Sequence, residues 1–302
     1  MRRIGVKGFF VILSFVAALL AGSLVLLEAA QLPYVDKPKV RMSIAAGGQD
    51  YGVLIMENPT PDARIMKVYL EDWYYAPEGD GSKQFVPAGT IVRSCASWIT
   101  FSPAEFTIPA FGRQRINYSV KVPADKKGGY FTTMFFETML SKVTSKDETE
   151  AQSAGINLAV RVATLFYVET KDTVKRTAEF KGLSLNKGDP KGLAIELEME
   201  NTGNTDITCS GIYHIIDKGG KIFARGAFEK VYTMSSDKVK LRSLWKDKIP
   251  SGSYDMVFTF DLGKGLEETG SGRGPIVTKE YEFEIDADGN AGKVTEPGKK
   301  NQ

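Results

Sequence analysis

Segments in which apolar and polar residues alternate recur from residue 38 to residue 286, and no segment after the first 30 residues has the period of an amphipathic helix. An alternation of period two is typical of strands with one buried face. Turn-forming Pro and Gly separate the segments, as in NPTPD, PADKKGGY and PAFGRQ. About seven such segments in each half predict an all-β fold of two tandem immunoglobulin-like β-sandwich domains.

The chain divides into four parts by composition. We expect a signal peptide or N-terminal anchor at 1–30, a first sandwich at 38–170, a second at 175–286 and a disordered tail at 287–302. In the first part, three basic residues precede an apolar stretch at 8–27, which is the pattern of an export signal. If this leader is not cleaved, the same stretch attaches the protein to the inner membrane. The protein is therefore expected in the periplasm or cell envelope.

Charge excludes one class of partner. The whole chain has 39 basic and 37 acidic residues, and residues 1–30 hold three and one of these, so 36 of each remain. No basic stripe with interleaved aromatic residues is present, so we expect no nucleic-acid binding. An oxidising compartment permits a disulfide between Cys95 and Cys209, the only cysteines. They lie in different halves, and two separate, partly buried thiols are favoured.

Residues that could carry chemistry are few. His214 is the only histidine, which argues against His-rich metal sites and a Ser-His-Asp mechanism. Glu196, Glu198 and Glu200 alternate with apolar residues, as on the solvated face of a sheet. The DADGN segment at 286–290 lacks the later Gly and Glu of a calcium loop. We predict no enzyme activity, no metal and no cofactor.

One run of residues is unusually long for a strand. In INLAVRVATLFYV, Ile156, Leu158, Val160 and Val162 share one parity, and after Thr164 the run is apolar on both parities. At about 3.3 Å per residue it would extend roughly 40 Å, whereas strands more often have about five or six residues. The run is either the last core strand of the first sandwich, fully paired at home, or an exposed strand that a partner can use.

The order of segments in the first half resembles a known family. FSPAEFTIPAFGRQRINYSV, then GGYFTTMFFE, then a polar loop and the alternating run that ends in LFY resemble the N-terminal domain of periplasmic pilus-assembly chaperones. The resemblance implies that the alternating residues of the last strand are donated to an exported, pilin-like subunit. Carried over by position, the donors are Ile156, Leu158, Val160 and Val162.

This chain departs from the family at the residues that anchor the subunit's carboxylate. The family has a basic residue just before LFY, where this chain has Thr164, and another in its first strand, where Arg41 does not align. Arg161 lies nearby on the opposite parity and is, with Thr164, an accessory candidate. SWITFSP and ENTGNTD also look like parts of exported surface proteins. The alternative function is therefore a surface or wall-associated adhesive scaffold.

Overall fold

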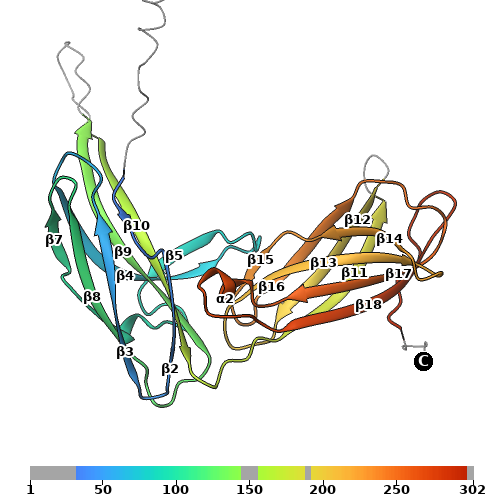
Figure 1. Ribbon diagram of the computed structural model, residues 1–302, viewed down its shortest axis with the longest axis horizontal. Coiled ribbons are helices and arrows are strands. Elements are labelled where there is room, and N and C mark those ends of the chain that lie inside the picture. The colour runs from blue at the N-terminus through green and yellow to red at the C-terminus, as the bar shows by residue number, and fades with distance from the viewer. Residues whose placement is uncertain (1–31, 144–155, 188–191, 298–302) are drawn as a thin grey trace, which may run out of the picture.

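The computed structural model describes residues 32–143, 156–187 and 192–297, which form two β-sandwiches side by side (Figure 1). The predicted all-β fold of two tandem immunoglobulin-like sandwiches is confirmed. Within the described ranges, no helix has the length and apolar character to cross a membrane. The predicted leader, including 8–27, lies outside those ranges.

The first sandwich consists of two sheets packed on one core. One sheet has the order β1-β3-β8-β6, and the other has the order β2-β10-β9-β4-β5 with β7 paired to β4. Their bounds are β1 Tyr34–Val35, β2 Lys39–Ile44, β3 Gln49–Glu57, β4 Arg64–Tyr75, β5 Lys83–Pro87, β6 Ile99–Ser102, β7 Glu105–Ile108, β8 Arg113–Lys121, β9 Gly129–Val143 and β10 Ile156–Thr170, with a 3-10 turn at Ala96–Trp98. Between the sheets, Leu54, Ile116 and Phe166 are among the fully buried side chains of the core.

The second sandwich is built in the same way. One sheet has the order β11-β12-β16, and the other has the order β14-β13-β17-β18 with β15 paired to β13. Their bounds are β11 Ala178–Lys187, β12 Leu193–Asn201, β13 Ile207–Asp217, β14 Ile222–Ala227, β15 Val231–Thr233, β16 Lys238–Trp245, β17 Gly252–Asp261 and β18 Ile276–Ile285, and a short helix α2 at Lys264–Glu268 follows β17. In β12 every second side chain is buried, so the sequence alternation that predicts a strand also identifies the face that lies toward the core.

A buried cluster of charges connects the two sandwiches. Arg41 on β2 donates to both carboxylate oxygens of Asp206 in the second sandwich, at 3.0 and 2.7 Å, and also to Glu169 on β10. Arg176, in the connection between the sandwiches, donates to Glu169 as well. The guanidinium of Arg41 lies 4.4 Å from the ring centroid of Tyr167. Since such charges are costly to bury alone, this pairing fixes how the sandwiches meet.

An aromatic contact and a backbone hydrogen bond also belong to the interface between the sandwiches. Trp73 and Tyr167 belong to an aromatic cluster on the outer face of the first sandwich, against which Tyr232 and Met234 of the second sandwich pack. Gly129 donates its N–H to Asn204 O at 2.9 Å. A Cβ on Gly129 would lie 2.1 Å from Thr205 Oγ1, so the glycine permits the close approach.

Some parts of the chain differ in detail from the sequence-based expectations. A disordered tail is predicted from residue 287, but Thr295 exchanges two backbone hydrogen bonds with Glu282 on β18. Ala291 and Val294 pack on the core of the second sandwich, so the described residues 287–297 fold back onto it because they can bury apolar side chains there. Cys95 and Cys209 are separate, buried thiols. Burial raises the pKa of both.

The charge cluster predicts a specific loss of stability. We expect Arg41→Met to lower the free energy of unfolding by about 3 kcal/mol, because it leaves carboxylates buried without their main partner. Chemical denaturation should measure this, and Arg41→Met with Asp206→Leu should recover part of the loss. Equal destabilisation by the single and double variants would contradict this role.

The same cluster predicts acid sensitivity. Burial alone would raise the pKa of Asp206, but the charge and hydrogen bonds of Arg41 outweigh it and hold the pKa below its ordinary value. The stabilisation is therefore present above the unfolded value of about 3.9 and is lost as the pH falls through the lower folded value. Thermal unfolding of wild type between pH 6 and 2 should show this loss, and the Arg41→Met, Asp206→Leu double variant should show a shallower pH dependence.

Candidate functional site

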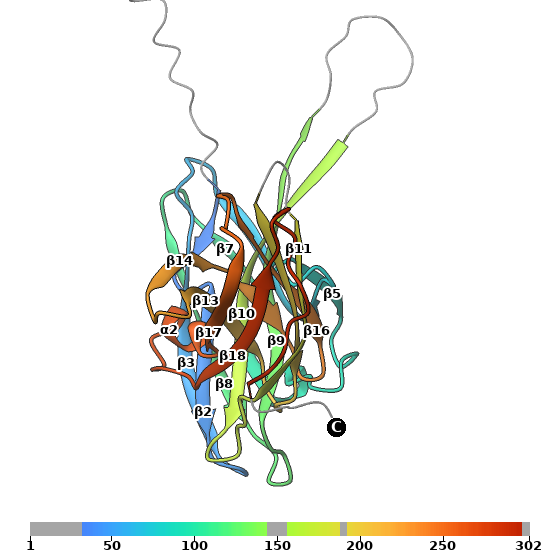
Figure 2. The same cartoon turned by 90° about the vertical axis from the view of Figure 1, so that its right-hand side faces the viewer.

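The long strand β10 is paired differently along its two halves. Its entire length pairs with β9, from Ile156 opposite Val143 to Glu169 opposite Gly129. On its other edge, β2 pairs with it in parallel only from Leu165 to Thr170. Among the described residues, no strand pairs with that edge between 156 and 164. In Figure 2 the far ends of β9 and β10 project beyond the two sandwiches.

The four predicted donor residues lie on this free half of β10. Leu158 is 51% exposed, Val160 is half-buried, and Val162 packs against the core of the first sandwich. They share a face with Phe166, which is fully buried in that core. The side chain of Ile156 lies outside the described part of the molecule, so only its place in the strand is given. The strand thus changes gradually from core to exposed edge.

The two accessory candidates are already committed to other partners. Arg161 projects from the opposite face, where its Nη2 lies 2.7 Å from Glu71 Oε2 and its Cζ lies 3.8 Å from the ring centroid of Phe135. Thr164 is buried and donates its hydroxyl to Lys37 O at 2.8 Å. Thr164 therefore closes the junction at which β2 joins β10. Arg161 is therefore not a free cation at the unpaired edge of β10, and Thr164 carries no charge.

A group of lysines that the sequence did not single out lies between the sandwiches. Lys39, in register with Leu165, places its Nζ 2.6 Å from Glu268 Oε2, and Lys230 places its Nζ 2.7 Å from the other oxygen. Lys83 lies close enough to feel the charges of Lys39 and Glu268, and its Nζ is 5.6 Å from the ring centroid of Trp73. We call these three lysines and Glu268 the lysine cluster.

The electrostatics of the lysine cluster favour an added anion. Lys39 and Lys230 contact the carboxylate of Glu268, while the Nζ of Lys83 donates to Gly81 O at 2.8 Å. No carboxylate of the described residues lies within ion-pair distance of Lys83. Burial, and then the charge of Lys39, lowers the pKa of Lys83. The sequence signal for Lys39 was weak because only the parallel pairing of β2 with β10 brings it beside the LFY segment.

The other predicted features have structural partners. Glu196 accepts from Lys240 at 2.6 Å and from Arg242 at 3.0 Å on the solvated face of the β11-β12-β16 sheet. His214 lies within β13, opposite Arg225 of β14. Within the described ranges, no group of three His, Cys, Asp or Glu side chains could hold a metal ion.

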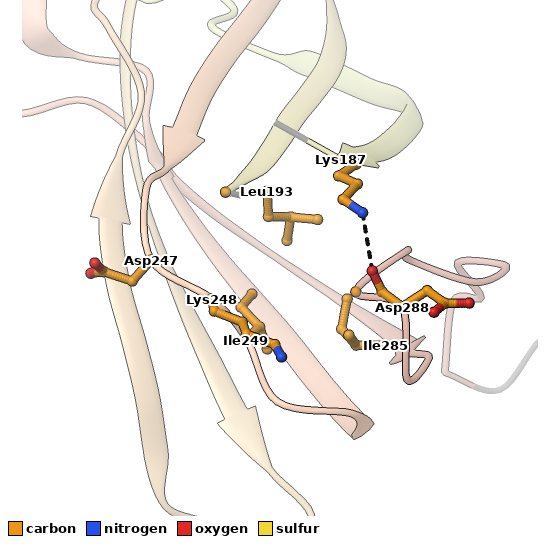
Figure 3. Close-up of a pocket in the computed structure, with 9 residues that line it drawn as sticks. Lys187, Leu193, Asp247, Lys248, Ile249, Ile285 and Asp288 are labelled. Atoms are coloured by element: carbon orange, nitrogen blue, oxygen red, sulfur yellow. Dashed lines mark hydrogen bonds between the residues drawn. The ribbon is translucent and has the colours of Figure 1, made fainter. Parts of the chain in front are cut away.

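A hollow of about 180 Å³ lies in the second sandwich, where Lys187 donates to Asp288 O at 3.1 Å (Figure 3). Leu193, Ile249 and Ile285 line it. These residues belong to the second sandwich alone, so the hollow is separate from the free edge of β10 and from the lysine cluster.

Comparisons with known proteins give matches among solved structures only. No family model matches the chain, and no curated protein matches it. The class 5 fimbriae chaperone CfaA is 13% identical, with a TM-score of 0.46 over 82% of this chain and 98% of its own. A chain of the Salmonella enterica SafA pilin–SafB chaperone complex is 14% identical, with a TM-score of 0.40 over 83% and 97%.

A third match is the E. coli chaperone DraB, at 12% identity and a TM-score of 0.38 over 89% of this chain and 97% of DraB. All three solved structures contain fimbrial chaperones, to which this chain is similar at low identity. At such identities the function of this chain has to be argued from its own residues.

Proposed function

We propose that this protein is an exported, non-catalytic, chaperone-like protein of the periplasm or cell envelope. Its partners would be exported, pilin-like subunits, and β10 would bind them by strand addition at its free edge. The observation that carries this proposal is the pairing of β10, which is complete along β9 but stops at Leu165 along β2.

A free edge of this kind is a liability unless it is used. Unpaired main-chain groups beside exposed apolar side chains invite association with other chains, and proteins usually shorten, charge or cover such edges. Here Leu158 remains half exposed at the edge. Strand addition uses both features, because main-chain hydrogen bonds supply affinity and alternate side chains fill pockets in the partner.

The lysine cluster supports a second contact with the partner. A subunit that adds a strand beside Ile156 to Thr164 would run toward the end of β2, where Lys39 lies beside Leu165. We propose that Lys83, together with Lys39, binds the subunit's terminal carboxylate in place of the basic residue that this chain lacks at Thr164. An ammonium that is partly desolvated and has no carboxylate of its own gains most from such a partner.

Substitutions on the two faces of β10 test strand donation. Leu158→Asp and Val160→Asp should each weaken capture of an exported subunit by more than about tenfold, because a buried Val or Leu side chain contributes about 1.5–3 kcal/mol. Ala159→Asp is the matched control, since Ala159 is exposed on the opposite face. Pull-down from the protein's own cell envelope, with subunits identified by mass spectrometry, measures the effect.

The alternative function, an adhesive scaffold, predicts that these substitutions leave capture unchanged. If folded Leu158→Asp and Val160→Asp variants capture the same material as wild type, or if only wall fragments are captured, strand donation is wrong. Unfolding midpoints of all variants should be measured first, so that loss of capture is not confused with loss of fold.

Hydrogen exchange tests the free edge directly. In an antiparallel pair, alternate residues direct their N–H groups toward the partner strand. We expect every second amide from 157 to 163 to exchange rapidly in the unbound protein, and amides from 165 to 170 to be protected. Slow exchange of all amides from 157 to 163 would mean that the edge is already covered.

Charge removal tests the carboxylate contact. Lys83→Met should weaken subunit capture about tenfold, because a hydrogen bond to a charged group is worth about 1.5–3 kcal/mol. Lys181→Met, which removes an exposed lysine of the second sandwich, should have no effect. The same subunit with an amidated C-terminus should bind wild type and Lys83→Met equally, and a persisting difference would contradict the assignment of Lys83.

A further inference from the structure

A cavity of about 400 Å³ lies between the sandwiches, and none of the three lysines of the lysine cluster lines it. Both sandwiches line it, with residues of β4, the 91–93 loop and the start of β9 on one side and residues 234–236 on the other. Among the residues that line it are Trp73, Ile91, Arg93, Phe131, Met234 and Ser236. Small-molecule sites typically have volumes of about 300–1,000 Å³, often at domain interfaces.

Much of the cavity wall is apolar. Trp73 and Phe131 are buried aromatic residues behind it, and Ile91 and Met234 are partly buried aliphatic ones. The accessible parts of Ile91 and Met234 can bury the face of an aromatic ring.

Arg93 is the one charged side chain among these lining residues. Its Nη1 donates to the carbonyl oxygens of Lys127 and Gly129, both at 3.3 Å. No carboxylate in the described part of the chain forms an ion pair with it, and none lines the cavity. The guanidinium therefore retains donors that can meet an anion.

Trp73 lies beneath the cavity wall with no accessible surface of its own, and its indole Nε1 makes no hydrogen bond to any described residue. Its signal therefore reports changes in the wall rather than a direct contact with a ligand. Ser236 adds local backbone strain with φ 73°, and its N–H is held by Asn201 O at 2.9 Å. Strained residues that neighbours hold in place are enriched at ligand sites.

We propose that this cavity binds a small aromatic carboxylate. Its ring would lie against the partly exposed Ile91 and Met234, over the buried rings of Trp73 and Phe131, and its carboxylate would accept hydrogen bonds from Arg93. Because residues of both sandwiches line the cavity, the ligand would stabilise their mutual arrangement. This site does not depend on strand donation by β10.

Indole resonances provide a direct test on the full chain. The chain has three tryptophans, so an ¹⁵N-labelled sample gives three indole N–H signals, assigned with Trp98→Phe and Trp245→Phe variants. The probe is 2-naphthoate, and its neutral counterpart is 2-naphthamide. We expect 2-naphthoate to shift the Trp73 signal saturably with a Kd below about 1 mM. The Trp245 signal should stay in place, because Trp245 packs within the second sandwich.

Two variants separate the anion contact from the apolar contact. Arg93→Gln should weaken 2-naphthoate binding about tenfold and leave 2-naphthamide binding unchanged. Ile91→Trp, which fills the cavity from a partly exposed position, should abolish binding of both probes. Arg115→Gln is the control, since it removes an exposed arginine of β8, which belongs to the other sheet of the first sandwich and does not line the cavity.

The outcomes decide the proposal. Absence of a saturable Trp73 shift, a shift confined to Trp245, or equal binding of 2-naphthoate by folded Arg93→Gln and wild type would each overturn it. If wild type binds the neutral 2-naphthamide as tightly as 2-naphthoate, the carboxylate contact is wrong. Capture of subunits through β10 should be unaffected by Ile91→Trp, so failure here is distinguishable from failure of the proposed function.

Discussion

The parallel pairing of β2 with the second half of β10 is the constraint on which the rest of the molecule depends. This pairing begins at Leu165 and ends at Thr170, and it places Lys39 and Arg41 on the face directed toward the second sandwich. Arg41 can then join Glu169 and Asp206, and Lys39 can join Glu268. Because β2 begins only opposite Leu165, the first half of β10 keeps one edge free. The junction between sandwiches and the free edge therefore arise from the same short ladder.

The two faces of β10 make different contacts, and alternate residues along the strand belong to alternate faces. Even-numbered residues continue from the core residue Phe166 to the exposed Leu158, whereas odd-numbered ones include Tyr167 and Glu169 at the junction with the second sandwich. A slip of one residue would exchange these faces and bury the edge residues against the wrong partners. The core on one face and the charge cluster on the other both oppose such a slip. The core contacts and the charge cluster therefore specify the same register of β10.

Much of the fold could be predicted from the sequence because its signals are local. Alternation along β12 and Pro-Gly turns predict strands without reference to the rest of the chain. The shared strand face of Leu158, Val160 and Val162 could be predicted for the same reason, whereas their proposed role as donors comes from the resemblance of the segment order to pilus chaperones. The lysine cluster could not, because Lys39, Lys83 and Glu268 are far apart in the sequence and meet only through tertiary structure.

The residues 287–297 show how local composition misleads in the opposite direction. Gly, Asp and Lys in this segment match a disordered tail, yet Ala291 and Val294 find apolar surface on the second sandwich and Thr295 joins the edge of β18. This contact also explains why the second sandwich does not present β18 as a second free edge along its whole length: the folded segment pairs with Glu282 and Ile285. A terminal segment thus covers part of an edge strand that would otherwise be open to pairing with another chain.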